Sequence, residues 1–301
     1  YGPTITADGN DGYVAWQEYS SDTSGFTYNI VSRHSSNGGS SWDSATTVTD
    51  SDGTHYIPEI AYGNDVVHLT WHAYNTDGNA QYTIEYASSD DDGTTWDRQV
   101  LRDPSAAAGW CWFPNIATED DKVYVVWQDD DWDENAIYDM EVVLKKSDDN
   151  GETWDEGTLL VPSRDTSTSF TYMLPAVTSA GGYVYVSYQD YNGATYDHYF
   201  KFSQDSGNGW SDEYTVTDDH NLNYAKMDLT IDEDGKTYFG YSDDTNIAEE
   251  EAEDNDIFIR ATIDGYPTNP TINLDGGSDD WDWPGKFNPD NSPVTWKDSG
   301  E

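Results

Sequence analysis

Short runs in which aliphatic positions alternate with aromatic or polar ones recur along the whole chain. Residues 123–127 read VYVVW and residues 183–188 read YVYVSY. Segments of this kind, with a period of two and many aromatic and β-branched residues, predict β-strands. No segment shows the 3.6-residue spacing of apolar positions that would predict an amphipathic helix instead. The pattern therefore predicts an all-β protein made of many short strands.

An eight-residue motif occurs four times at nearly constant spacing. It consists of Ser, Asn or Asp, Gly and Trp at its first, third, fifth and eighth positions, and its tryptophans lie 54, 58 and 56 residues apart. The Ser and Asp side chains can bond backbone N–H groups in a tight turn, and Gly supplies the left-handed conformation. The motif residues are Ser35, Asn37, Gly39 and Trp42; Ser89, Asp91, Gly93 and Trp96; Ser147, Asp149, Gly151 and Trp154; and Ser203, Asp205, Gly207 and Trp210.

A second motif, an aromatic residue closely followed by Pro, precedes each copy of the first. A fifth unit runs from residue 224 to residue 260, and its own eight-residue motif has decayed at residues 263–265. Each unit holds about four strands, and repeats of this length are typical of β-propeller blades. We therefore expect a β-propeller of five visible four-stranded blades, with a sixth either missing or completed by the termini.

The eight-residue motif closely resembles the Asp-box (BNR) repeat of the sialidase-like β-propeller superfamily, over residues 1–265. In that superfamily the box joins the two outer strands of a blade, away from the ligand face, so the resemblance implies a structural role for all four copies. Residues 266–301 differ in character, being acidic and rich in Pro and Trp. We interpret them as a linker or the start of a further module, and they resemble junctions between domains of large archaeal surface proteins.

The chain is strongly acidic, with 13 Lys and Arg against 59 Asp and Glu and a net charge of −46. Nucleic-acid binding needs clustered Lys and Arg, so this charge argues against such a partner, and an anionic membrane would repel it. The acids are spread through every segment, which favours a surface adapted to high salt, with Ca²⁺ bound by some carboxylates. Aromatic residues make up 15% of the chain and can still build a core.

Other chemical signals are sparse. Cys111 is the single cysteine, so no disulfide framework is expected, and no apolar run approaches the ~20 residues of a membrane-spanning helix. We find neither a signal peptide nor a fingerprint for an organic cofactor. We expect an extracellular or cell-surface protein that does not insert directly into a membrane.

The resemblance also allows a test for sialidase activity. Sialidases hold the substrate carboxylate with three arginines, because a guanidinium pairs with a carboxylate through two bonds. One of these arginines opens an Arg-Ile-Pro motif, and Tyr56 takes its place here. Arg98, Arg102 and Arg164 follow boxes and are expected in connections between blades, whereas Arg33 and Arg260 are expected on outer strands. Since none matches a position of the triad, we do not expect sialidase activity.

The resemblance places the start of each inner strand on the ligand face. Five aromatic residues would then form a ring around the channel mouth, and exposed aromatic rings can stack on sugars. The same residues could instead wedge neighbouring blades together, and both interpretations stay open. They are Tyr1, Tyr56, Trp112, Tyr172 and Tyr224.

Acidic residues follow the second strand of most units and would return to the same mouth. If the protein is an enzyme, Asp129, Asp190 and Asp243 are the candidate acids, because paired carboxylates can perform acid–base catalysis. Hydrogen bonding between blades, or simple solvation, is the structural alternative. Acidic loops around residues 129–135 and 275–280 suggest Ca²⁺ ligands or plain solvated loops. The candidate ligands are Asp129, Asp131, Asp133, Asp275 and Asp279.

Three functions are compatible with these features, because a fold alone does not decide function. The first is a non-catalytic recognition or structural module of a larger surface or secreted protein from a salt-adapted microbe, which would bind glycans or protein partners. The second is a glycoside hydrolase or lyase that uses carboxylates at the mouth. The third is a self-assembling subunit of a surface layer or an extracellular filament.

Overall fold

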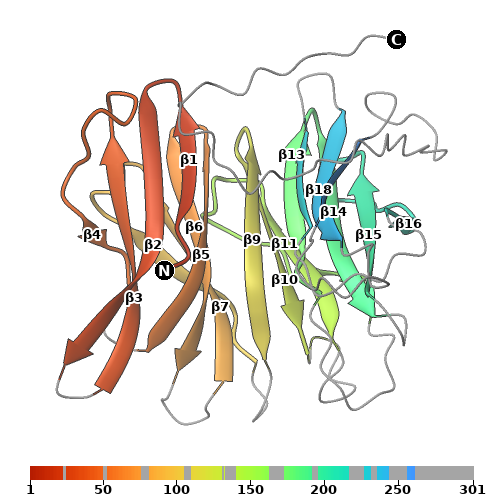
Figure 1. The fold of residues 1–301 in the computed structure, drawn as a ribbon, viewed down its shortest axis with the longest axis horizontal. Coiled ribbons are helices and arrows are strands. Elements are labelled where there is room, and N and C mark those ends of the chain that lie inside the picture. The colour runs from red at the N-terminus through yellow and green to blue at the C-terminus, as the bar shows by residue number, and fades with distance from the viewer. Residues whose placement is uncertain are drawn as a thin grey trace.

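The computed structural model describes residues 1–22, 25–49, 53–75, 81–104, 110–130, 132, 140–162, 173–191, 196–216, 227–231, 236–243 and 256–261. These residues form β-strands and turns, and they contain no helix long and apolar enough to cross a membrane. The strands belong to successive antiparallel sheets that follow one another across the molecule (Figure 1).

We call the sheets blades A to E in chain order. Blade A contains β1 (Thr4–Asp8), β2 (Asp11–Asp22), β3 (Gly25–Ser35) and β4 (Thr46–Thr47). Blade B contains β5 (Thr54–Gly63), β6 (Val66–Asn75), β7 (Gln81–Ser89) and β8 (Asp97–Arg102). Blade C contains β9 (Cys111–Glu119), β10 (Lys122–Asp129), β11 (Glu141–Ser147) and β12 (Thr158–Val161). Blade D contains β13 (Ala176–Ala180), β14 (Tyr183–Tyr191), β15 (Tyr196–Ser203) and β16 (Tyr214–Thr215). Blade E contains β17 (Asp228–Ile231), β18 (Thr237–Asp243) and β19 (Asp256–Ala261).

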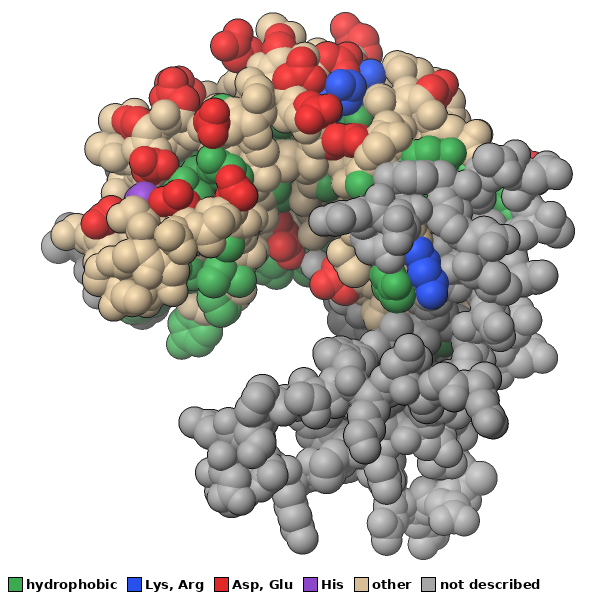
Figure 2. Space-filling view, turned by 90° about the horizontal axis from the view of Figure 1, so that it is seen from above, with side chains coloured by type: hydrophobic (Ala, Val, Ile, Leu, Met, Phe, Trp, Pro, Cys, Tyr) green, Lys and Arg blue, Asp and Glu red, His purple; other side chains and the backbone are tan. Residues whose placement is uncertain are grey.

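Each blade is an antiparallel meander whose strands are ordered as in the sequence, and the blades are arranged in an arc around a central hollow (Figure 2). This arrangement is a β-propeller, so the predicted fold class is confirmed. Blades A to D have the four strands expected, whereas blade E has three within the described ranges. The decayed motif at 263–265 and the tail at 266–301 lie outside those ranges.

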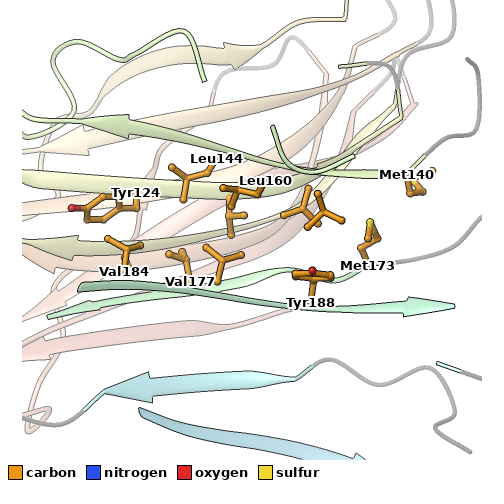
Figure 3. Close-up of a cluster of buried hydrophobic side chains, with 13 residues drawn as sticks. Tyr124, Met140, Leu144, Leu160, Met173, Val177, Val184 and Tyr188 are labelled. Carbon is orange, nitrogen blue, oxygen red and sulfur yellow. The ribbon is translucent and has the colours of Figure 1, made fainter. Parts of the chain in front are cut away.

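Blades pack face to face through apolar side chains. The innermost strand of each blade contacts the blade before it: β5 packs on blade A, β9 on blade B, β13 on blade C and β17 on blade D. Between blades C and D, Tyr124 and Leu144 meet Val177, Val184 and Tyr188 in one buried cluster (Figure 3). Side chains alternate between the two faces of a strand, so one face of each sheet is available for this contact.

The four eight-residue motifs form turns of the same geometry, which we call the box turns. The backbone N–H of Gly93 donates to the Ser89 hydroxyl at 2.9 Å, and the Thr95 N–H donates to Asp91 at 2.8 Å, with equivalent bonds in the other copies. The four motif glycines have φ between 78° and 84°, a conformation that favours glycine. The bonds to Asp91 lower the pKa of its carboxyl, those from Thr95 foremost.

The box turns lie at one end of the blades. Strand register places Ser89 beside Val67, near the start of β6, whereas the far end of β6 at Tyr74 pairs with Thr54 at the start of β5. We call the end that holds the box turns the box face, and the opposite end, where inner strands begin, the mouth face. The predicted separation of boxes from the mouth is therefore present in the structure.

Box turns also contact the preceding blade. The Tyr13 hydroxyl of blade A donates to Asp92 of blade B at 2.8 Å. In blade C, a Cβ atom added to Gly151 would lie 1.9 Å from the hydroxyl oxygen of Tyr86 in blade B. Gly151 therefore permits both a left-handed turn and a close approach between blades.

One tryptophan position recurs in three blades with different burial. Trp71 and Trp127 are fully buried, and each belongs to a cluster shared with the preceding blade. Trp16 has the same place in blade A, the first blade of this chain, and it is only partly buried. Ile5 is likewise 68% exposed, whereas its counterpart Ile60 is 8% exposed.

This difference predicts unequal costs for the same substitution. Trp71→Ala and Trp127→Ala should each lower the free energy of unfolding by about 3–5 kcal/mol, the range for large buried side chains. Trp16→Ala should cost less than half as much, because it removes less buried area. Urea unfolding in molar KCl, followed by circular dichroism, measures all three. Equal losses would show that Trp16 is packed as tightly as the other two.

Candidate ligand-binding face

The aromatic–Pro motifs form irregular turns at the mouth face. The residue just before Pro has a positive φ in four blades: 56° at Gly2, 51° at Ile57, 52° at Phe113 and 43° at Leu174. Non-glycine residues seldom adopt such values, and a following proline further restricts them. In blades B and C the strand register shifts at this point, as in a β-bulge, which can re-aim the side chains around it.

A glutamine from the preceding blade holds two of these turns. The side-chain oxygen of Gln17 accepts the Ile57 N–H at 2.9 Å, and that of Gln128 accepts the Met173 N–H at 2.9 Å. His72 occupies the same repeat position in blade B and packs its ring against Phe113, with centroids 5.8 Å apart. These contacts join neighbouring blades at the mouth.

Three of the five predicted mouth aromatics lie within the described ranges. Tyr1 is 78% exposed, and Tyr56 and Trp112 are partly buried. Tyr172 and Tyr224 lie outside those ranges. Tyr56 contacts Tyr28 of the preceding blade at 5.7 Å between ring centroids, and Trp112 contacts Tyr82 at 5.4 Å. Tyr56 and Trp112 therefore wedge blades together while keeping part of their surface exposed.

These residues belong to a longer chain of rings, which we call the aromatic track. Successive ring centroids lie 5.1–5.8 Å apart from blade A to blade C, and Tyr1 and Tyr74 attach at the sides, at 6.1 and 5.0 Å. The main line runs through Tyr19, Tyr28, Tyr56, His72, Tyr82, Trp112 and Trp110.

Sequence reasoning missed the parts of the track that lie on hairpins. Tyr19 pairs in register with Tyr28 across β2 and β3, and Tyr74 pairs with Tyr82 across β6 and β7. The sequence did contain a signal for these residues. In blades A, B and D, a tyrosine lies three residues after the aromatic residue that recurs on the second strand, at positions 19, 74 and 191.

The track is electrically neutral near physiological pH. Burial lowers the pKa of His72 to about 3, so its imidazole is uncharged there. Burial also raises the pKa of the hydroxyls of Tyr56 and Tyr82. An uncharged aromatic surface suits the apolar faces of a ligand rather than its charged groups.

Asp129, predicted both as a catalytic acid and as a calcium ligand, is completely buried and bound to protein groups. Its two oxygens accept bonds from Arg102 at 2.8 and 3.2 Å, and Trp127 Nε1 donates to it at 3.0 Å. Arg102 belongs to β8 of blade B and Asp129 to β10 of blade C, so the pair joins two blades. This arrangement favours a structural role for Asp129.

Arg98 forms a related pair inside blade B. It donates to the buried Glu85 at 2.9 Å, and Trp71 Nε1 donates to the same carboxylate at 3.1 Å. The expectation that Arg98 and Arg102 lie in connections between blades is wrong: both are on β8, the outer strand of blade B, because that strand begins directly after the box turn. Arg33 is exposed on β3, 6.0 Å from the ring of Trp16.

The other candidate acids have different settings. Asp190 is partly buried near the end of β14, where it pairs in register with Asp197. The pKa of Tyr199 is raised to about 12, and burial is the largest cause. The negative charges of nearby carboxylates, including Asp197 and Asp190, raise it further. Asp243 ends β18, and its side chain lies outside the described part, as does Arg164.

The described residues contain no group of three or more His, Cys, Asp or Glu side chains placed to hold a metal ion. The predicted calcium ligands Asp131, Asp133, Asp275 and Asp279 are outside those residues. Cys111 is buried, and its thiol donates to the carbonyl oxygen of Tyr82 at 3.0 Å.

Comparison with known proteins supports the fold. No protein-family model and no curated sequence matches the chain. A leech intramolecular trans-sialidase matches with a TM-score of 0.58 at 11% identity, over 90% of this chain and 60% of that one. The microbial sialidase Hz136 matches with a TM-score of 0.55 at 18% identity, over 92% and 58%. A thermostable family-43 glycoside hydrolase matches with a TM-score of 0.54 at 17% identity, over 92% of both chains.

These neighbours are β-propeller proteins, and at such low identity the likeness defines the fold alone. The chain spans about three-fifths of the length of the two sialidases it matches. It is therefore similar in architecture to sialidases and to family-43 glycoside hydrolases.

The ion pair of Arg102 and Asp129 predicts that removing the arginine alone costs more stability than removing both partners. Arg102→Met should lower the free energy of unfolding by about 3–5 kcal/mol, because it leaves a buried carboxylate without its counter-charge. The double variant Arg102→Met, Asp129→Leu should recover much of this loss by removing that charge. Urea unfolding at fixed salt compares the two. A double variant no more stable than the single one would mean that the charge of Asp129 is not what makes the loss of Arg102 costly.

Proposed function

We propose that this chain is a non-catalytic recognition module that binds glycans through its mouth face. The observation that carries the proposal is the aromatic track, an uncharged line of rings across three blades in which the tyrosines and tryptophans are at least partly exposed and His72 is buried. Single exposed hydrophobic residues are ordinary on protein surfaces, but a contiguous patch marks an interaction site. Aromatic rings present flat apolar faces, which stack well on the C–H faces of sugars.

The neighbouring structures support a glycan ligand at the level of the fold. Sialidases and a family-43 glycoside hydrolase act on sugars, and they are built on the same kind of propeller. A glycan ligand therefore suits this architecture, although the chemistry of any site must come from its own residues.

The setting of the mouth carboxylates supports binding over hydrolysis. A glycoside hydrolase of the common kind needs two carboxyl groups about 5–10 Å apart across an open site. Asp129 is instead buried against Arg102, and Glu85 is buried against Arg98. Asp190 and Asp243 remain the acids on which the hydrolase or lyase alternative depends.

The wider setting is also a proposal. The net charge of −46 suits a salt-adapted microbe, and an extracellular or cell-surface location, with Ca²⁺ bound by acidic loops, would suit such a module. A protein partner on the same face, and assembly into a surface layer or filament, are the remaining alternatives. The sequence favours neither nucleic acid nor membrane as a partner.

A glycan array probed in molar KCl, with and without Ca²⁺, tests the proposal. We expect binding that Tyr56→Ala and Trp112→Ala each weaken at least about tenfold, since central aromatic residues typically contribute more than ~1.4 kcal/mol. Tyr62→Ala is the matched control, because Tyr62 is partly buried on the same strand as Tyr56 but near the box face. An array without binding would overturn the proposal, and turnover of a bound glycan would favour the hydrolase.

A further inference from the structure

The aromatic track runs across the blades and includes rings on both inner and outer strands. In each blade the strands are ordered from the innermost to the outermost, so β3 and β7 are third from the centre. Tyr28 lies on β3 and Tyr82 on β7, whereas Tyr56 and Trp112 lie on inner strands. The line of rings therefore alternates between inner and outer strands from blade A to blade C.

Wedging between blades explains only part of this line. The contacts Tyr28–Tyr56 and Tyr82–Trp112 cross from one blade to the next and stabilise the packing. The contacts Tyr19–Tyr28 and Tyr74–Tyr82 lie within a single blade, near the mouth ends of its second and third strands. Tyr19 and Tyr74 therefore add ring contacts inside their own blades, and Tyr19 is 45% exposed.

The shape of the track selects an extended ligand. A single sugar covers one or two rings, so a ligand that contacts the exposed rings from Tyr19 to Trp110, passing over the buried His72, must be a chain that crosses three blades. Each further sugar unit that contacts the track increases the affinity. The translational and rotational entropy of association is lost only once for the whole chain, so later contacts do not incur that cost again.

Charge selects a neutral ligand. An anionic sugar is usually held by arginine through paired bonds to its carboxylate. The guanidinium groups of Arg98 and Arg102 are already bound to Glu85 and Asp129. With a net charge of −46, the protein also repels an anionic chain at long range, most strongly at low salt.

We propose that the aromatic track binds an uncharged, extended glycan chain that lies across blades A, B and C. This inference rests on the proposed function and names its ligand class. It places the two ends of the site at Tyr19, on β2 of blade A, and at Trp110, which contacts Trp112 of blade C.

Calorimetric titration with size-graded neutral oligosaccharides tests the inference, using gluco-, manno- and xylo-oligosaccharides of two to eight units. The acidic comparison is an oligogalacturonate series. We expect affinity for one neutral series to increase with chain length, with little dependence on KCl concentration, and the acidic series to bind at least tenfold more weakly at low salt. Tyr19→Ala and Trp110→Ala should each shorten the length at which affinity stops increasing, with disaccharide affinity unchanged. Tyr62→Ala, with the fold of every variant checked by circular dichroism, should match the parent.

The outcomes separate this inference from the proposed function. Affinity that is the same for two and eight units, and that depends on Tyr56 and Trp112 but not on Tyr19 or Trp110, would overturn the extended track and leave a local glycan site. Tighter binding of oligogalacturonate would overturn the neutral ligand. The absence of binding to any oligosaccharide would overturn the proposed function as well.

Discussion

Each of blades B to E packs one face against the blade before it, and aromatic side chains supply much of that contact. With 35% hydrophobic residues and a net charge of −46, the chain has little aliphatic material for a core. Large rings compensate, because each buries far more area than an aliphatic side chain. Trp71, Trp127, Tyr86 and Tyr185 are among the largest fully buried side chains, and all lie on the two middle strands of their blades.

The two ends of the blades fasten these contacts by different means. At the box face, rigid turns with left-handed glycines fit against tyrosines of the preceding blade. At the mouth face, glutamine side chains bind backbone N–H groups, and Arg102 binds Asp129 across a blade boundary. At the mouth face, aromatic residues also form contacts inside single blades, as Tyr19 does with Tyr28 and Tyr74 with Tyr82. These additional rings are the basis of the proposed ligand site.

The sequence predicted the blades well because the box turn is a local structure: Ser89, Asp91 and Gly93 form their bonds within five residues. The start of the inner strands at the mouth was implied by the resemblance to the sialidase-like superfamily. Contacts between blades could not be predicted so directly. The partner of Asp129 is 27 residues away on another blade, and nothing local marks Arg102 as that partner. The same holds for Tyr28 and Tyr56, whose contact depends on the angle between two sheets.

Hydrogen–deuterium exchange with a bound neutral oligosaccharide tests the central claim, that the ligand lies on the aromatic mouth face, most directly. We predict that peptides covering the mouth ends of β2, β3, β6 and β7 become protected, and that the box turns at residues 89–96 and 147–154 exchange as in the free protein. Protection confined to the box turns, or spread evenly over all blades, would contradict the account.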